Sequence, residues 1–325
     1  MSDPDWSFES STDPGQWRQV DSPVSTTLFD AAATVNGPVA VGKKGVVVGR
    51  ADDGTWGVVV ENGPAARGAA LHSVAVTDDG KRLWVAGNSG ALGSYDIPTE
   101  SREDHSEPKG ITGTLNAVTV SGARGEEKLL VADNSGNVLP GYVTDDGVDW
   151  EFEMRPNGDT AFEDLDADDA GYGYGVDANA NVFETTADRG WQHVGVADAS
   201  VSLYAAAVDG DRFLTAGGNG RAFETVDGGD EWTPYDLGNF SVHDVDVRDG
   251  FSLAVGSGGH IVVRDAGGDW VGADWRKSKT VYGCVAGGDS FPSVAVGSGG
   301  RIVERVSEQS ADGSGDGSGD GSGDA

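Results

Sequence analysis

The sequence predicts an all-β protein, a single seven-bladed β-propeller of four-stranded antiparallel blades. Three observations support this prediction: a pattern of about 42 residues occurs seven times, its apolar residues alternate as in strands, and turns rich in Gly and Asp separate the runs. Four strands in a repeat of this length are typical of one propeller blade. A closed ring of blades also protects the sheet edges that an open array would expose.

The repeat is clearest in an apolar run that closes on Gly or Asp and is followed three residues later by Gly or Ala. These runs are 39–42, 84–87, 130–133, 174–177, 214–217, 253–256 and 294–297. Each run predicts a strand followed by a tight turn. About a dozen residues earlier, an alternating run predicts the innermost strand of each blade. These runs begin at Leu28, Leu71, Leu115, Phe162, Leu203, Val242 and Val281.

A turn rich in Asp and Gly that leads into Trp predicts the outermost strand. Thr225–Trp232 is the clearest copy, and looser copies end at Trp56, Trp150, Trp191 and Trp270. The seventh repeat stops near Arg305 without this element, which occurs instead at the start of the chain, in residues 11–20. We therefore expect the N-terminal strand to complete the last blade and close the ring.

The turn Ser/Thr-x-Asp-x-Gly-x-x-Trp at 225–232 resembles the Asp-box of bacterial neuraminidase repeats. With the recurring Ala-Val-Gly-x-x-Gly, it makes residues 10–306 similar to seven-bladed propellers of the photosystem II assembly/stability factor type. The resemblance implies the fold and says little about function, because propellers host many functions. In such a turn we expect the Asp to accept backbone N–H groups and the Trp to pack between strands.

The composition is strongly acidic, with 54 Asp and Glu against 22 Lys and Arg and a net charge of -32. Asp dominates and Lys is scarce, as in proteins of extremely halophilic archaea, where concentrated salt screens the self-repulsion. This charge argues against binding to nucleic acid or to anionic membranes. No leader or membrane-spanning segment is recognisable, so we expect a monomeric cytoplasmic protein. We expect an extension at 1–9, the propeller at 10–306 and a disordered acidic tail at 307–325.

The innermost strands supply the candidate binding site. Aligning the repeats places one residue of each blade at the mouth of the central channel: Phe29, His72, Asn116, Glu163, Tyr204, His243 and Tyr282. All but Phe29 are polar or amphipathic, as expected of groups that line a ligand site. A half-exposed strand start also tolerates polar residues, so the alternative is that these residues have no binding role.

Carboxylates on the same strands form two further columns, one of Asp30, Asp164 and Asp244 and one of Asp166 and Asp246. Buried carboxylates need compensation. They could ligate a hard cation such as calcium, or accept backbone N–H groups from neighbouring blades, or face a wet channel. No other cofactor is indicated, and the lone Cys284 excludes an internal disulfide.

Two functions from different classes fit this sequence. The first is a non-enzymatic binding or scaffold propeller whose partner is a protein or a small ligand. The alternative is a glycosidase- or lyase-like enzyme in which Glu163, Tyr204 and Tyr282, or the two histidines His72 and His243, converge at the channel mouth, although the ring contains no Arg. The charged loop 97–112, which replaces the Asp-rich turn of the second repeat, is either a second binding surface or a solvated loop.

Overall fold

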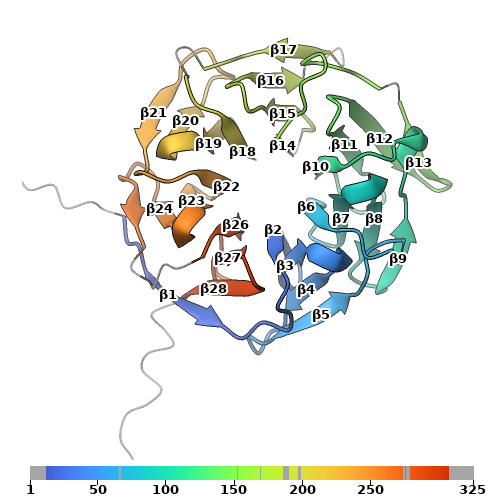
Figure 1. The fold of residues 1–325 in the computed structure, drawn as a ribbon, viewed down its shortest axis with the longest axis horizontal. Helices are drawn as coiled ribbons and strands as arrows, with labels where there is room; N and C mark the ends of the chain where they lie inside the picture. Colours follow the sequence, from blue (N-terminus) through green and yellow to red (C-terminus); the bar gives the residue numbers. More distant parts are fainter. Residues whose placement is uncertain are drawn as a thin grey trace, which may run out of the picture.

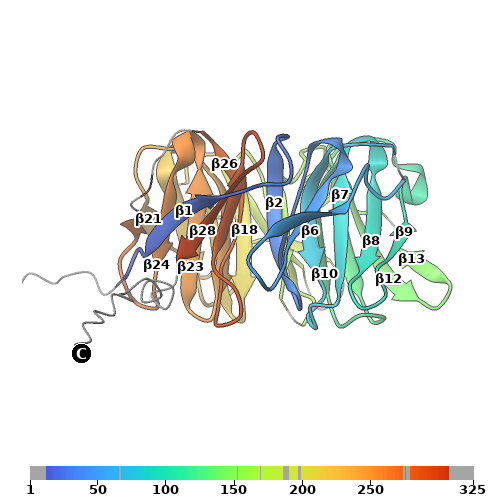
Figure 2. The ribbon, with the colours of Figure 1, turned by 90° about the horizontal axis from the view of Figure 1, so that it is seen from below.

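In a computed structural model of the protein, seven four-stranded antiparallel sheets form a closed ring (Figure 1). The structure describes residues 12–306 except 66, 152, 169, 186–189, 197–198, 274 and 276–278. The ring confirms the predicted seven-bladed β-propeller, and the side view shows a flat disc with the strands running between its two faces (Figure 2). Within the described part, no helix is long and apolar enough to cross a membrane.

Each blade has four strands that run from the channel to the rim. The first two blades are β2 (Leu28–Thr34), β3 (Gly37–Gly42), β4 (Val47–Arg50) and β5 (Trp56–Val60), then β6 (Leu71–Val76), β7 (Arg82–Gly87), β8 (Leu92–Asp96) and β9 (Ser101–Asp104). The third and fourth are β10 (Leu115–Ser121), β11 (Lys128–Asp133), β12 (Val138–Thr144) and β13 (Gly147–Trp150), then β14 (Asp164–Ala167), β15 (Gly173–Val176), β16 (Val182–Thr185) and β17 (Trp191–His193).

The remaining three blades follow the same order. The fifth and sixth are β18 (Leu203–Asp209), β19 (Arg212–Gly217), β20 (Arg221–Thr225) and β21 (Thr233–Asp236), then β22 (Val242–Arg248), β23 (Phe251–Gly256), β24 (Ile261–Arg264) and β25 (Val271–Gly272). The seventh is β26 (Val281–Val285), β27 (Val294–Gly297), β28 (Arg301–Val306) and β1 (Gln16–Val20). One-turn 3-10 helices are η1 (Lys43–Gly45), η2 (Asn88–Gly90), η3 (Pro108–Gly110), η4 (Gly218–Gly220) and η5 (Ser257–Gly259).

The hydrophobic core lies between the blades rather than in one central mass. Val39 and Val41 of the first blade pack in one cluster with Leu71, Leu83 and Val85 of the second. Because the second strand of a blade is covered on both faces by its neighbours, its residues are apolar without interruption, and most of β3 is buried. This double coverage explains why the apolar runs were the clearest part of the sequence repeat.

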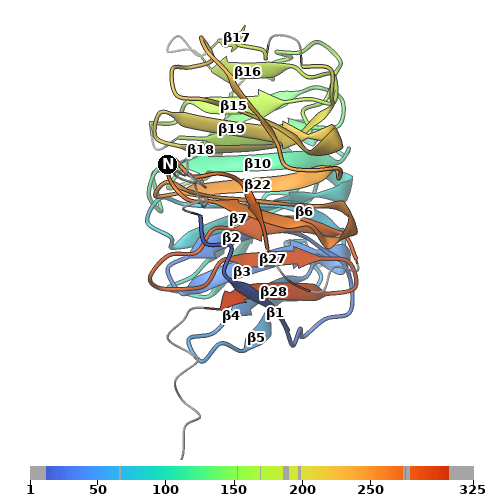
Figure 3. The same cartoon turned by 90° about the vertical axis from the view of Figure 1, so that its left-hand side faces the viewer.

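The N-terminal strand closes the ring as predicted. β1 pairs antiparallel with β28, from Gln16 opposite Val306 to Val20 opposite Ile302 (Figure 3). Trp17 is 6% exposed and belongs to a core cluster with Leu253 and Val303. The predicted extension at 1–9 and the predicted tail at 307–325 lie outside the described residues.

The turn at 225–232 shows the contacts expected of its Asp and Trp. The Asp227 carboxylate accepts the backbone N–H of Glu231 at 3.0 Å and the Thr225 hydroxyl at 2.7 Å. The indole of Trp232 meets Phe213 edge-on and donates to the Val194 carbonyl, which precedes this blade, at 3.3 Å. The turn therefore anchors the outer strand of one blade to the chain that leads into it.

Candidate functional site

A β-bulge places the predicted mouth residues in six of the seven blades. In each of these blades the register of the innermost strand shifts across one unpaired residue, which is Phe29, His72, Asn116, Tyr204, His243 or Tyr282. The fourth blade differs, because Glu163 lies just before β14 and its N–H bonds to the Val176 carbonyl. A bulge redirects a side chain away from the ladder. The repeated bulge therefore presents these residues at the face where the inner strands begin, which we call the mouth face.

Four of the seven side chains form a continuous row across blades two, one, seven and six. The ring of Phe29 lies 4.9 Å from that of His72 and 5.7 Å from that of Tyr282. Tyr282 lies 5.3 Å from His243. These distances are typical of stabilising aromatic contacts. The row, which we call the aromatic row, crosses the seam where the two ends of the propeller sequence meet.

Local contacts orient the row. His72 Nε2 lies 2.8 Å from Asn88 Oδ1, in the turn that follows the second strand of its blade. Burial lowers the pKa of His243, which favours the neutral imidazole near neutral pH. The row therefore presents aromatic, hydrogen-bonding side chains.

The other three predicted residues lie at the equivalent positions of blades three to five, outside the row. Asn116 donates to the Phe162 carbonyl at 3.1 Å and so links the third blade to the fourth. Glu163 has an exposed side chain at the channel mouth, yet partial desolvation and the nearby charge of Asp177 raise its pKa. Tyr204 is half-buried at its bulge. The structure thus brings His72, Phe29, Tyr282 and His243 into one row of ring contacts, in which Glu163 and Tyr204 take no part.

The central channel encloses a cavity of about 510 Å³ that begins beneath the mouth residues. None of the seven mouth residues lines it; its lining starts at Asp30, Ser73, Asp164 and Asp244 and reaches the hairpins of the opposite face. The candidate site on the mouth face is therefore a surface, separate from this cavity.

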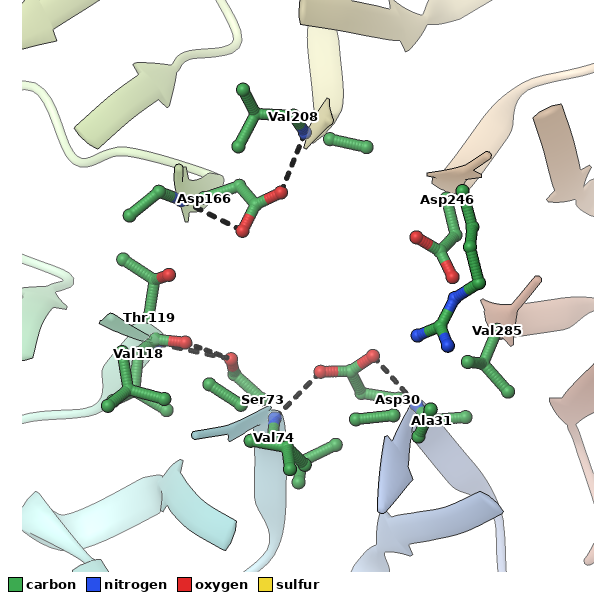
Figure 4. Close-up of a pocket in the computed structure, with 18 of the residues that line it drawn as sticks. Asp30, Ala31, Ser73, Val74, Val118, Thr119, Asp166, Val208, Asp246 and Val285 are labelled. Carbon is green, nitrogen blue, oxygen red and sulfur yellow. Dashed lines mark hydrogen bonds between the residues drawn. The ribbon is translucent and has the colours of Figure 1, made fainter. Parts of the chain in front are cut away.

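The channel carboxylates act as links between blades (Figure 4). Asp30 accepts the N–H of Ala31 in its own strand and that of Val74 in the next blade, both at 2.7 Å. Asp164, Asp166, Asp244 and Asp246 repeat this pattern toward Ala206, Val208, Cys284 and Ala286. Ser73, in the same column as Asp30, accepts the N–H of Val118 at 3.1 Å. The bonds satisfy inner-edge N–H groups that lack a strand partner.

Enclosure of these carboxylates changes their acidity. Each of these side chains keeps part of its surface exposed, because it faces the cavity. The cavity is nevertheless surrounded by protein on its sides. Desolvation raises the pKa of Asp30 and Asp166 to about 7 and that of Asp246 to about 6, against the lowering effect of the backbone N–H bonds. It also raises the pKa of Asp164 and Asp244, and neighbouring carboxylates add to the effect.

A cation site, one of the three uses considered for these carboxylates, lacks a ligand cluster among the described residues. Within that part of the chain, no three His, Cys, Asp or Glu side chains lie close enough together to hold one metal ion. Asp30, Asp164 and Asp244 stand on separate blades, and each is occupied by its two N–H groups. This geometry matches the alternative in which they bind the backbone of neighbouring blades.

The loop at 97–112 contains the fourth strand of its blade and a strained turn. β9 and η3 lie in it, and Glu107 and Lys109 both have positive φ, of 59° and 52°. Glu107 forms an ion pair with Arg67 at 2.7 Å. The end of the loop is tied to η2 on the mouth face through the N–H of Gly90 and the carbonyl of Gly113.

Sequence reasoning missed Lys43, Lys44 and Lys279 on the mouth face, although Lys109 lies in the charged loop 97–112 that it had singled out. Lys43 and Lys44 in η1, Lys109 in η3 and Lys279 before β26 are all exposed on this face. The available signal was their position in turns, in a chain that has very few lysines.

Comparisons with known proteins agree with this fold. No known protein family matches the sequence, and a search of curated proteins finds no match. Among solved structures, virginiamycin B lyase from Staphylococcus aureus is similar with a TM-score of 0.72 and 13% identity, over 89% of this chain and 98% of that one. YCF48 bound to D1 peptide has a TM-score of 0.71 and 15% identity, over 92% of this chain and 96% of that one. The WD40 repeats of RRP9 have a TM-score of 0.73 and 11% identity, over 89% of this chain and 96% of that one. At these identities the likeness shows the fold alone: the chain is a seven-bladed β-propeller.

Proposed function

We propose that this propeller is a non-enzymatic binding protein that holds a protein partner on its mouth face. The observation that carries the proposal is the bulge at one equivalent position in six blades. A bulge interrupts the ladder and is common beside functional sites. Its recurrence directs His72, Asn116, Tyr204, His243 and Tyr282 to one surface, and Glu163 joins them from the fourth blade.

The similar structures support a protein partner without identifying one. YCF48 was solved with a D1 peptide, and another similar propeller belongs to the mitotic checkpoint complex. The composition further supports a salt-adapted surface, and we propose a monomer that works in a salt-rich cytoplasm and binds neither nucleic acid nor membranes.

An affinity pull-down in multimolar potassium chloride, read by mass spectrometry, tests the mouth face. The test variant carries Ala at His72, Glu163, Tyr204 and His243. The matched control carries Ser at Val35 and Val226, which are 59% and 65% exposed in hairpins of the opposite face. A partner retained by wild type and control but lost in the test variant supports the proposal. A partner lost only in the control moves the interface to the opposite face.

A second candidate function, a lyase- or glycosidase-like enzyme, rests on Glu163. A carboxyl group with a raised pKa at the end of a channel is a candidate general acid. Incubation of the protein with virginiamycin B and with aryl glycosides, followed by mass spectrometry, tests this function. Product from wild type but not from Glu163→Gln would favour the enzyme, whereas no product from either favours binding alone.

A further inference from the structure

The four exposed lysines of the mouth face lie together on one arc of the ring. Lys279 leads into the seventh blade, Lys43 and Lys44 turn in the first, and Lys109 follows the second. These three blades are consecutive, because β26 and β2 adjoin across the closure and β2 adjoins β6 (Figure 1). The other described lysines, Lys81 and Lys128, lie at hairpins of the opposite face.

The charge balance on this arc differs from that of the whole chain. Acidic residues outnumber basic ones more than twofold over the sequence. In the described mouth-face connections of blades seven, one and two, the order is reversed. The basic residues there are Lys43, Lys44, Arg67, Lys109 and Lys279, and the acidic residues are Asp21, Glu61 and Glu107.

The lysines are also unpaired. Among the described residues, none of the four has a carboxylate within ion-pair distance, whereas Arg67 is paired with Glu107 and Lys81 with Asp79. Four ammonium groups that form no ion pair with a described carboxylate, in a chain so rich in carboxylates, leave a positive surface available for an external anion.

Backbone geometry shows that two of these lysines occupy unfavourable positions. Lys44 has a φ of 66° and Lys109 a φ of 52°, in the left-handed region. At the position equivalent to Lys44, the sixth and seventh blades have Gly258 and Gly299, for which this conformation costs little, whereas Ser89 and Asn219 adopt it in the second and fifth blades. The left-handed conformation is therefore a property of this turn in the repeat, and Lys44 adds a charge at a position whose backbone the fold already defines.

The arc and the aromatic row lie side by side. Lys43 Nζ stands 6.0 Å from the ring of Phe29, at the outer limit of a cation–π contact. Lys279 precedes Tyr282 by three residues, and its Nζ lies beside Gly299. The mouth face thus offers an inner line of aromatic rings and an outer line of ammonium groups along the same blades.

We propose that blades seven, one and two bind an extended acidic segment of the partner protein, with its carboxylates on the lysine arc and its apolar side chains on the aromatic row. This inference rests on the proposed function and specifies the chemistry of the partner. An acidic peptide is favoured over a nucleic acid because a nucleic acid is held by neutralising many phosphates along its length, whereas the basic residues here are confined to one arc of a chain with a net charge of -32.

The test uses fluorescence anisotropy with the full-length protein and a labelled ten-residue peptide of alternating Glu and Phe. The test variant is Lys43→Ser, Lys44→Gly, Lys109→Gly and Lys279→Ser. The matched control, Lys81→Ser with Lys128→Ser, removes lysines from the opposite face. We expect Kd to rise at least tenfold in the test variant and less than twofold in the control. Circular dichroism confirms that each protein is folded under the assay conditions.

Three results would overturn the inference. They are failure of wild type to bind the peptide, an equal loss in both variants, and tighter binding of an oligo-dT strand or of a Gln–Phe peptide. The pull-down described above, run with both test variants, separates failure of this inference from failure of the proposed function. Suppose that a partner is lost when His72, Glu163, Tyr204 and His243 are replaced but is retained when the four lysines are replaced. The protein would then be a mouth-face binding protein whose partner is not acidic.

Discussion

The Asp30 carboxylate on the first blade accepts the backbone N–H of Val74 on the second blade at 2.7 Å. An innermost strand is an edge strand, so its channel-side N–H groups have no ladder partner. Ser73 makes the corresponding contact to Val118 with a neutral hydroxyl. The channel therefore joins blades through side chains, and the charge of a carboxylate is not required for the bond.

Replacing Asp30 with Leu should destabilise the propeller more than replacing it with Ser. Leu leaves the Val74 N–H without an acceptor, which costs about 1–3 kcal/mol, while Ser can reproduce the contact that Ser73 makes. Denaturant unfolding at pH 5 and constant potassium chloride measures both variants. At this pH the carboxyl, with a pKa of about 7, is largely protonated, so relief of charge contributes little. Equal losses for Leu and Ser would contradict the linking role.

Stability should fall as the pH rises from 5 to 8. The pKa values of Asp30, Asp166 and Asp246 are raised to about 6–7 in the folded protein, above their ordinary value of 3.8. A raised carboxyl pKa means that the folded state binds protons more tightly, so its contribution is fully present below the ordinary value of 3.8 and is lost progressively as the pH rises from there through 6–7. Each pKa unit corresponds to about 1.4 kcal/mol.

Thermal unfolding at fixed ionic strength measures this pH dependence. The variant Asp166→Ser with Asp246→Ser should flatten the decline between pH 5 and 8. Asp227→Asn is the control: hydrogen bonds in its turn lower the pKa of Asp227, so its contribution is lost only in stronger acid. A decline that persists unchanged in the double variant would show that other groups cause it.

Removing the Trp17 side chain should weaken the closure of the ring. This residue is 6% exposed and packs with Leu253 and Val303, and its Nε1 donates to the Pro14 carbonyl at 3.0 Å. Trp17→Ala should cost about 3–5 kcal/mol of unfolding free energy, as expected for a large aromatic side chain in a core. Gln19→Ala, at an exposed position of the same strand, should change it by less than about 0.5 kcal/mol.

Lys44→Gly should stabilise the fold while weakening acidic-peptide binding. The left-handed conformation costs an L-residue about 1–2 kcal/mol. Glycine removes this cost, but its greater freedom in the unfolded state offsets part of the gain in stability. A net gain of about 0.5–1 kcal/mol in denaturant unfolding is expected. Lys43→Gly is the comparison, because Lys43 does not adopt a positive φ and should gain nothing. Loss of stability in Lys44→Gly would contradict the strain argument.

The repeats and the elements within them could be predicted because their signals are local. A second strand such as β3 is covered on both faces, so its apolar run is continuous, and tight turns follow it at a fixed spacing. The seventh repeat lacks a fourth strand and the N-terminal segment has a spare one, and in the structure β1 supplies that strand by pairing with β28. The alignment of the repeats also identified the mouth residues, because the same position in each repeat lies at the start of the innermost strand of its blade.

The bulges and the links between blades could not be read from the sequence. A bulge depends on the register between two strands, and the alternation of residues alone did not show that Phe29 or Tyr282 is the unpaired one. The columns of Asp were visible, but three uses for them remained possible. The choice depends on which backbone N–H of the next blade lies within reach, and only the packing of blade against blade determines that distance.

A ring of seven four-stranded blades follows from the sequence, because period-two alternation, turn chemistry and repeat number are local features of the chain. Which mouth residues touch depends on how the blades close into a ring. His72 and His243 are far apart in the sequence, yet they belong to one row because closure of the ring places Phe29 beside Tyr282. The same closure gathers Lys279, Lys43, Lys44 and Lys109 on one arc, since neighbours in a circle include the two ends of the chain.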